Sequence, residues 1–437
     1  MRIAIVGSGI AGLACAHALR ADADITVFEA EPRLGGHTNT VDVTLEGRTF
    51  GVDTGFLVFN QRTYPGFVQL LAELQVPTAR SEMSFGLSVA LGSGRQLEWA
   101  GTNLDTVFAQ RRNLVSPAFL RMLAELLRFN AQATQLTASG AAPLHQTLGA
   151  FLDANGYGRE LRDCYLLPMA AAIWSCPVAT MLDYPVTPFL RFCHNHGLLQ
   201  VTDRPQWYTV RGGAGQYVTA IARGLRDVRL ATPVRAVRRL GPGGVAVTST
   251  QGTERFDHVV LACHSDQSLR LLVDADAMEQ RLLGACRYQP NRGLLHTDTR
   301  LLPRTRRVWS AWNYLSDTAS DTASDARGER GAPRVSVTYL LNRLQPLPVS
   351  TPLMVSLNPL REPHPGTVFA EFDYAHPVFD AAAIAAQRRL PQLQGRGNLW
   401  FAGAWTGFGF HEDGLQSGLA VAAALRERRA ADRRLAA

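Results

Sequence analysis

The sequence contains no lysine, so all 44 of its basic residues are arginines. This absence excludes chemistry that needs a lysine amine: Schiff-base formation, attachment of pyridoxal phosphate and the lysine of a Walker-type phosphate loop. The formal charge of +7 nevertheless favours anionic partners such as acyl carboxylates or phospholipid headgroups. No nucleic-acid-binding motif accompanies the charge, so we expect no nucleic-acid partner.

Cysteine is also scarce, with six residues among 437. They form no Cys-x-x-Cys pair and show no ligand-like spacing with histidine, so we expect reduced thiols, no metal site and a cytoplasmic location. His194 and His196 flank Asn195 as a His-x-His pair, but no third ligand follows at a supporting spacing.

Long membrane-spanning runs are missing as well. The uncharged run from Cys164 to Leu182 comes nearest, but Pro168 and Pro177 interrupt it, which favours a buried segment. Charged residues make up 19% and hydrophobic residues 46%, a globular composition, and the length suits two domains.

The order of apolar runs predicts an α/β fold that begins β-α-β. Ile3 to Val6 and Ile25 to Glu29 are short β-runs, and Gly9 to Arg20 between them has a helical pattern. Residues 102–200 are mostly helical in pattern, after which β-runs return. We therefore predict a discontinuous Rossmann-type domain and an α+β substrate domain, mostly helical with a mixed or antiparallel sheet. The first comprises residues 1–80, 205–290 and 365–437, and the second residues 81–204 and 291–364.

Several shorter segments have a local interpretation. Met83 to Leu91 and Gln96 to Trp99 predict a hairpin around a turn at residues 92–94. The Ser-Asp-Thr-Ala repeat within residues 316–333 predicts a surface loop. It joins two expected strands, Val308 to Leu315 and Arg334 to Leu341. Further strands are expected at Val228 to Arg238, Gly244 to Ser249 and His258 to Ala262.

A glycine loop joins the first strand to the first helix. Its glycines permit a tight turn and let backbone N–H groups approach a diphosphate at the helix N-terminus. Glu29 ends the second strand about twenty residues later, where its carboxylate can accept hydrogen bonds from a ribose diol. The loop consists of Gly7, Ser8, Gly9, Ile10, Ala11 and Gly12.

The segment that follows, Glu29-Ala30-Glu31-Pro32-Arg33-Leu34-Gly35-Gly36-His37, resembles the second dinucleotide signature of one flavoprotein superfamily. This superfamily comprises FAD-dependent amine oxidases, protoporphyrinogen oxidase and phytoene desaturase. The resemblance implies non-covalent FAD and an amine-oxidase-like architecture. Family members usually have arginine where His37 stands. The cofactor-binding residues that it implies in this segment are Ala30, Arg33, Gly35, Gly36 and His37.

The C-terminal segments resemble the flavin motif of the same superfamily. They are Leu399-Trp400-Phe401-Ala402-Gly403-Ala404-Trp405 and His411-Glu412-Asp413-Gly414-Leu415-Gln416-Ser417-Gly418. Asp413 and Gln416 fit a capping box ahead of a helix from Gly418 to Leu425. Family members place an acid at Ala404, so that contact is absent here. The further cofactor-binding residues implied are Thr54, Gly55, Phe56, Val234, Gly403, Ala404, Asp413, Gly414 and Leu415. For Val234, a strand residue without ligand contact is the alternative.

Additional segments, including Ala172-Ile173-Trp174-Ser175 and Arg204-Pro205-Gln206-Trp207, resemble a bacterial subgroup of predicted FAD-binding proteins. Its members are often encoded beside methyltransferases of the cyclopropane-fatty-acid-synthase type. Some are implicated in desaturating methyl-branched acyl chains. The resemblance implies a hydride-withdrawing oxidoreductase with a fatty acyl substrate and a methyltransferase as neighbour. A redox-neutral fatty acid isomerase and a non-catalytic, FAD-bound partner of that methyltransferase are the alternatives.

We expect four residues nearest the flavin: His411, Glu412, Trp405 and Trp174. His411 can act as a base near neutral pH or make only a structural hydrogen bond. The two tryptophans can form the wall of a lipid slot or pack in the core. Tyr64 has the same two interpretations, active-site lining or core.

The segment from Phe119 to Phe129 combines helical, apolar and basic character. It can rest on a membrane surface, which would place the protein at the inner face of the membrane, or it can cover the substrate domain.

Overall fold

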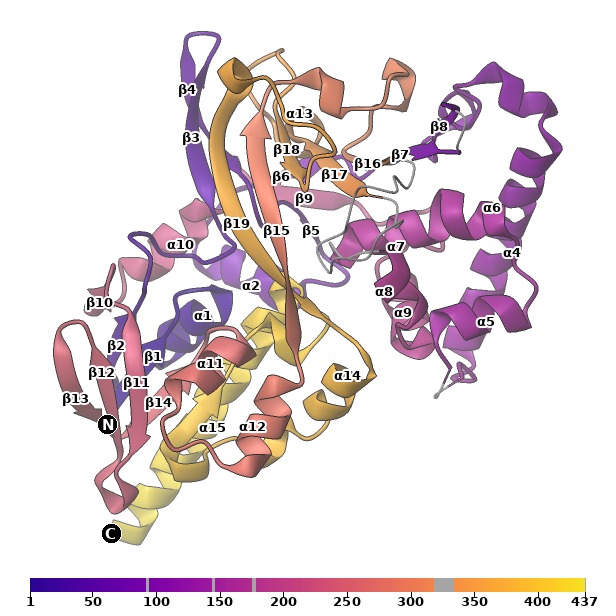
Figure 1. Cartoon of the computed structure of the whole chain (residues 1–437). Helices are drawn as coiled ribbons and strands as arrows, with labels where there is room; N and C mark the ends of the chain where they lie inside the picture. The colour runs from indigo at the N-terminus through magenta and orange to yellow at the C-terminus, as the bar shows by residue number, and fades with distance from the viewer. Residues whose placement is uncertain (92–93, 144–145, 175–177, 318–333, 437) are drawn as a thin grey trace.

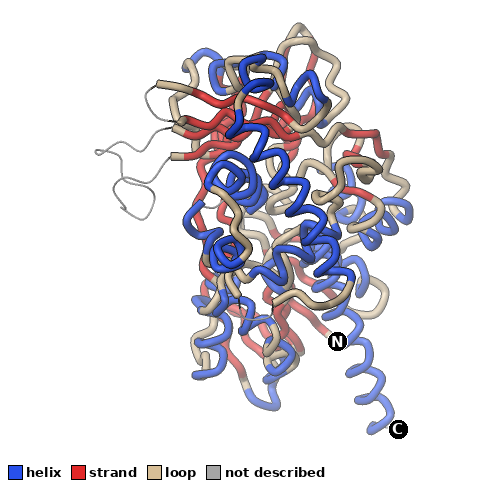
Figure 2. Tube along the Cα trace, turned by 90° about the vertical axis from the view of Figure 1, so that its right-hand side faces the viewer, coloured by secondary structure: helices blue, strands red, loops and turns tan. Residues whose placement is uncertain are grey.

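The computed structural model describes residues 1–91, 94–143, 146–174, 178–317 and 334–436 (Figure 1). The turn residues Gly92 and Ser93, Cys176, and residues 318–333 of the expected loop therefore lie outside the described residues. Both termini lie at the same end of the molecule in both overall views (Figures 1 and 2).

A five-stranded parallel sheet forms the first layer, in the order β10-β2-β1-β14-β20. Ile3 to Val6 of β1 are buried, as expected of a parallel strand covered on both faces. The sheet confirms the predicted Rossmann-type α/β fold. Its strands are β1 (Arg2–Val6), β2 (Asp24–Phe28), β10 (Asp227–Arg229), β14 (His258–Leu261) and β20 (Leu399–Phe401).

The two ends of the chain meet beneath this sheet. Helix α1 (Ile10–Leu19) packs along α15 (His411–Ala436), as Figure 1 shows. The contact needs a residue without a side chain, because a Cβ at Gly418 would lie 2.1 Å from the carbonyl oxygen of Ala11. Both helices therefore begin next to the carboxyl ends of the parallel strands, where open α/β sheets bind their ligands.

A mixed seven-stranded sheet forms the second layer, in the order β19-β15-β18-β17-β16-β7-β8. Among the described residues of this sheet, β16 and β7 pair in parallel and the other neighbours are antiparallel. Its long β19 pairs with β15, although the predicted segment 365–437 assigns that strand to the cofactor domain; the domain boundaries stay a prediction. The strands are β7 (Phe85–Ala90), β8 (Gln96–Ala100), β15 (Arg287–His296), β16 (Trp312–Ser316), β17 (Val335–Leu340), β18 (Met354–Leu357) and β19 (Val368–Val378).

Helices cover one side of the second layer; in Figure 2 they lie in front of the strands. The longest is α4 (Pro117–Ala138), which Ser116 caps by accepting the N–H of Phe119. Phe119 and Phe129 point into the core, whereas Leu120 and Leu127 are exposed. The other helices of this layer are α5 (Leu148–Ala154), α6 (Arg159–Leu161), α7 (Leu167–Trp174), α8 (Val178–Leu182) and α9 (Val186–Asn195). None of the helices in the described part of the chain could cross a membrane.

The remaining, smaller elements complete the fold. They include the hairpin β3–β4, a three-stranded sheet of β5, β6 and β9, and the antiparallel β11-β12-β13. Their bounds are β3 (Thr40–Leu45), β4 (Arg48–Asp53), β5 (Phe59–Asn60), α2 (Pro65–Glu73), β6 (Thr78–Ser81), α3 (Leu104–Val107), β9 (Trp207–Val210), α10 (Gly215–Ala222), β11 (Val234–Arg239), β12 (Val245–Ser249), β13 (Gly252–Phe256), α11 (Ser265–Leu271), α12 (Ala277–Gly284), α13 (Leu341–Leu344) and α14 (Ala381–Gln387).

Two expected strands differ from the structure. The run from Val228 to Arg238 is two strands, because Ala231 adopts a positive φ of 46° and Pro233 cannot donate to a ladder. The run from Val308 to Leu315 becomes a strand only at Trp312. The side chain of Asn313 accepts the N–H of Ser310 and holds a turn there.

A buried carboxylate generates a prediction about stability. Asp53 accepts hydrogen bonds from the N–H of Ala214 (2.9 Å) and from the side chains of Thr40 and Gln345. Burial raises the pKa of Asp53 to about 7, well above its ordinary value. A raised folded-state pKa means that the native state loses stability as the pH rises from about 4 to 7, at about 1.4 kcal/mol for each pKa unit.

We expect Asp53→Asn to remove this loss. The amide of the variant does not titrate, so only the wild type loses stability in this range. The unfolding free energy of the wild type minus that of the variant should therefore decrease between pH 4 and 7. Urea unfolding at several pH values measures it, and a pH-independent difference would contradict the assignment.

Candidate functional site

A cavity of about 1290 Å³ opens between the two sheets. Its lining comes from the β1–α1 loop, from β19, from α7 and α9, and from the segment that enters α15. The volume exceeds the usual range of small-molecule pockets, so one cavity has room for a dinucleotide and a second ligand. We call the part around the glycine loop the cofactor end.

The glycine loop has the shape that a diphosphate requires. Gly7 has φ +103°, and a Cβ there would lie 2.7 Å from the carbonyl oxygen of Ala262. A Cβ at Gly12 would lie 2.0 Å from the carbonyl oxygen of Gly7. At Gly9, by contrast, a Cβ would meet nothing within 4 Å, so this face is open to the cavity at the N-terminus of α1.

The second signature folds against this loop. A Cβ at Gly36 would lie 3.2 Å from the Cα of Gly9, and Arg33 donates to the Gly36 carbonyl at 2.9 Å. Glu29 accepts the backbone N–H and the hydroxyl of Ser8, which holds its carboxylate at the end of β2. The two glycine segments thus form one cradle, and the residues present fit a dinucleotide.

Three histidines gather beside this cradle. The ring centroid of His37 lies 5.3 Å from that of His376 and 6.2 Å from that of His264. Burial lowers the pKa of His37 well below its ordinary value, and the neighbouring histidines lower it further. Burial likewise lowers the pKa of His376 to about 4 and depresses that of His264. At neutral pH the cluster is therefore uncharged.

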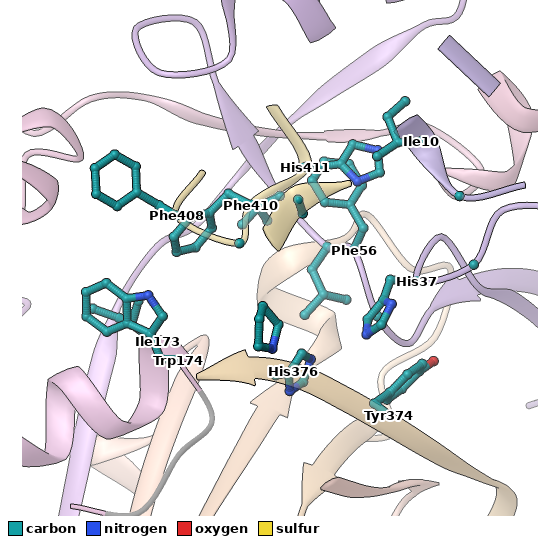
Figure 3. A pocket seen from close by; sticks show the side chains of 18 of the residues that line it. Ile10, His37, Phe56, Ile173, Trp174, Tyr374, His376, Phe408, Phe410 and His411 are labelled. Carbon is teal, nitrogen blue, oxygen red and sulfur yellow. The ribbon is translucent and has the colours of Figure 1, made fainter. Parts of the chain in front are cut away.

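His411 also lines the cavity, where its ring stacks on Phe56 with centroids 3.7 Å apart (Figure 3). Its Nε2 lies 2.9 Å from the hydroxyl of Tyr217, which in turn contacts Thr38 at 2.6 Å. Burial lowers the pKa of His411 to about 3. The hydrogen bond and the ring stacking fit the structural interpretation of His411, and its role as a base stays a prediction.

Glu412 is not among the residues that line the cavity, and its place near the flavin stays a prediction. Its carboxylate accepts the N–H groups of Gly66 and Phe67, both at 2.9 Å, and so caps α2. The predicted capping box is wrong, because α15 begins at His411. Asp413 lies in its first turn and accepts the N–H of Phe410.

The far part of the cavity is built of rings, and we call it the aromatic arm. Trp174 lies 4.8 Å from Phe192, and Phe192 lies 4.7 Å from Phe410, measured between centroids. Figure 3 shows Trp174 and Phe408 across the cavity from His37. The Nε1 of Trp174 has no partner among the described residues. The arm comprises Trp174, Phe192, His196, Trp207, Phe408 and Phe410.

Other predicted residues serve different purposes. The indole of Trp405 lines the cavity and donates to the carbonyl of Cys263 at 3.2 Å. Tyr64 is buried and lines the cavity as well. His196 contacts the Phe192 carbonyl through Nδ1 and stacks on Phe192. In the part of the chain that the structure describes, no three His, Cys, Asp or Glu side chains are arranged to hold a metal.

The structure brings most predicted cofactor-binding residues to the cavity. Those that line it are Gly7, Ser8, Gly9, Ile10, Ala11, Glu29, Arg33, Gly35, Gly36, His37, Thr54, Gly55, Phe56, Gly403 and Ala404. Those that do not are Gly12, Ala30, Val234, Asp413, Gly414 and Leu415. Gly12 and Gly414 act instead through close packing, since a Cβ at Gly414 would lie 2.8 Å from the side chain of Ile10.

Sequence reasoning missed the contribution of β19. Tyr374 lines the cavity, and its hydroxyl contacts the side chains of Thr54 (2.8 Å) and Asn39 (3.1 Å). His376 and Phe372 line it as well. The alternation Phe372-x-Tyr374-x-His376 puts three rings on one face of a strand, a signal that the sequence contains.

Comparisons with known proteins agree with this geometry. The family model described as flavin containing amine oxidoreductase matches residues 10–426. No curated protein matches the chain in sequence.

Solved structures share the fold at low sequence identity. Cyclohexylamine oxidase from Brevibacterium oxydans IH-35A is similar with a TM-score of 0.68 and 18% identity, over 98% of this chain and 99% of that one. Putrescine oxidase bound to putrescine has a TM-score of 0.66 and 15% identity, over 98% and 99%. A CLA-producing fatty acid isomerase from P. acnes has a TM-score of 0.65 and 15% identity, over 96% and 97%.

The two glycines of the first loop give a paired prediction. Gly9→Ala adds a methyl group to open space, so the cofactor-free protein should keep its melting temperature while FAD binding weakens about tenfold or more, which is about 1.4 kcal/mol. Gly7→Ala should lower the melting temperature as well, because of its positive φ and its close backbone neighbour. Differential scanning calorimetry and FAD titration check both. Unweakened FAD binding in Gly9→Ala would contradict the placement of the diphosphate.

The cap that Glu412 makes on α2 is testable on its own. Glu412→Gln weakens the cap of α2 and should cost about 1 kcal/mol of unfolding free energy, with no change in the visible flavin spectrum. Glu427→Gln, on the exposed face of the same helix, serves as the control and should change neither. A spectral shift in Glu412→Gln alone would argue for a place at the flavin.

Proposed function

The chain belongs to the family of flavin containing amine oxidoreductases and is an FAD-dependent oxidoreductase, and from that premise we propose that it acts on a long apolar substrate. The substrate class that we infer is an unsaturated or methyl-branched fatty acyl chain, from which a hydride is withdrawn. The hydride would pass to FAD and a proton from the neighbouring carbon to water, and the electron pair left behind would form one additional double bond in the product.

The observation that supports this substrate class is the chemistry of the aromatic arm. The acidic residues that line the cavity, all outside this arm, are Glu29, Glu31, Glu371 and Asp373. Glu29 is held by Ser8, and the exposed Glu371 pairs with Arg292. A protonated amine transferred into the arm would therefore lose its hydration without gaining a carboxylate partner, which is costly. An acyl chain has no such cost there.

The residues of the chain need to do little beyond binding and orientation. FAD supplies the hydride acceptor. The cradle of Gly9 and Gly36 would hold the dinucleotide, and the stacked pair of Phe56 and His411 would form a rigid wall of the cavity. The rings of the aromatic arm would exclude water and hold the acyl chain extended.

A redox-neutral fatty acid isomerase is the second candidate. Two observations favour it: the structural similarity to a fatty acid isomerase, and an apolar cavity that would keep water from a transient reactive chain. In that case the hydride returns to a different carbon, and the mass of the product equals that of the substrate.

The predicted partners stay predictions. Exposed Leu120 and Leu127 on α4 leave an apolar surface next to Arg121, which supports peripheral contact with an anionic membrane. A neighbouring methyltransferase is supported only by the resemblance to the bacterial subgroup.

Anaerobic single-turnover experiments test the proposal. Mixing the FAD-loaded protein with unsaturated and methyl-branched fatty acids and acyl phospholipids should bleach the flavin absorption near 450 nm, and the product should lose two hydrogens by mass spectrometry. Putrescine and cyclohexylamine serve as controls and should leave the flavin oxidised. Reduction by the amines alone would overturn the proposed substrate class, and isomerised product of unchanged mass would support the second candidate.

A further inference from the structure

A chain of hydrogen bonds runs from the backbone of β15 toward the cavity. The N–H of Arg292 donates to the side-chain oxygen of Asn358 at 3.0 Å. A backbone N–H is always a donor, so this bond fixes the orientation of the Asn358 amide. The amide nitrogen of Asn358 then donates to the side-chain oxygen of Asn291 at 2.7 Å.

Asn291 is fixed from both ends. Its oxygen accepts from Asn358, and its amide nitrogen donates to the carbonyl oxygen of Gln289 at 3.0 Å. The same nitrogen lies 2.9 Å from Nδ1 of His376. An amide nitrogen has only hydrogens to offer, so Nδ1 must accept. A neutral imidazole that accepts at Nδ1 carries its proton on Nε2.

The location of His376 gives this tautomer a use. His376 lines the cofactor end of the cavity beside Tyr374, and its ring centroid lies 5.3 Å from that of His37; Figure 3 shows the three side chains near one another. Within the described ranges its hydrogen bond is made through Nδ1, which leaves Nε2 for a ligand. Burial keeps the imidazole neutral at physiological pH, since it lowers the pKa of His376 to about 4.

We propose that Asn291 holds His376 as the Nε2–H tautomer, and that this neutral imidazole donates a hydrogen bond to an acceptor atom of the bound flavin. Reduction adds negative charge to the flavin ring, so a fixed donor stabilises the reduced form more than the oxidised form. His376 is thus a catalytic residue in contact with the cofactor, and Asn291 is a positioning residue that acts through it. The chain has no lysine to supply a donor there, and the histidine does so without bringing a charge.

The tautomer is measured directly by ¹⁵N NMR of FAD-loaded protein labelled at histidine, with His376→Gln identifying the signal. The wild type should show His376 protonated on Nε2 alone at pH 7. Asn291→Asp replaces the donor with an acceptor and should move the proton to Nδ1 or add one there. A wild-type signal from the Nδ1–H tautomer or from the imidazolium would overturn the proposal.

The effect on the flavin is measured by the ratio of the dissociation constants of oxidised and reduced FAD. His376→Leu removes the donor, so binding of reduced FAD should weaken about tenfold relative to oxidised FAD. His376→Gln keeps an N–H donor and should restore most of the ratio. For Asn291→Asp the direction follows from the NMR result: a proton moved to Nδ1 removes the Nε2 donor and should weaken binding of reduced FAD, as in His376→Leu, whereas an added proton makes an imidazolium and should strengthen it.

Asn342→Asp is the matched control for the loss of an amide donor, because Asn342 also holds backbone carbonyls, of Val349 and Thr351, but lies outside the cavity lining. It should leave the ratio unchanged. An unchanged ratio in His376→Leu would refute the contact with the flavin. Neither measurement uses a substrate, so the outcome is independent of whether the enzyme acts on acyl chains.

Discussion

The whole site depends on the close approach of two glycine segments near the N-terminus, the β1–α1 loop and the segment around Gly36. A Cβ at Gly36 would lie only 3.2 Å from the Cα of Gly9, and Arg33 holds the second segment in place by donating to the carbonyl of Gly36. This cradle sits at the carboxyl ends of the parallel strands, where α1 and α15 both begin. Residues 403–411 therefore complete a site that the first 40 residues begin, and the segments between them supply the rest of the cavity wall.

Exclusion of water determines the charge state of the histidines in the cavity. The cavity walls contain several histidines, and burial lowers the pKa of His37, His376 and His411 enough to keep all three neutral. Neutral imidazoles donate hydrogen bonds without bringing a cation into the cavity. Together with the rings of the aromatic arm, they make a cavity that is polar at the cofactor end and apolar beyond it.

Local sequence patterns predict the cofactor-binding half of the molecule well, because its glycines, its strand ends and Glu29 are close together in the sequence. Local patterns predict less where the outcome depends on a distant segment. Glu412 follows a flavin-like motif, yet its carboxylate caps α2, more than 340 positions earlier in the chain. Tyr374 and His376 were missed because a strand face is assigned to a cavity only once its partner β15 is known. The expected strand from Val228 to Arg238 is interrupted at Ala231 because this residue has a positive φ, which the sequence pattern does not predict.

The measurement that tests the central claim most directly is titration of the purified, cofactor-stripped chain with FAD, followed by its visible spectrum. If residues from both termini form one flavin site, the chain should bind one FAD and show the structured absorption of a flavin held out of water. A chain that stays colourless and does not bind added FAD would contradict the account.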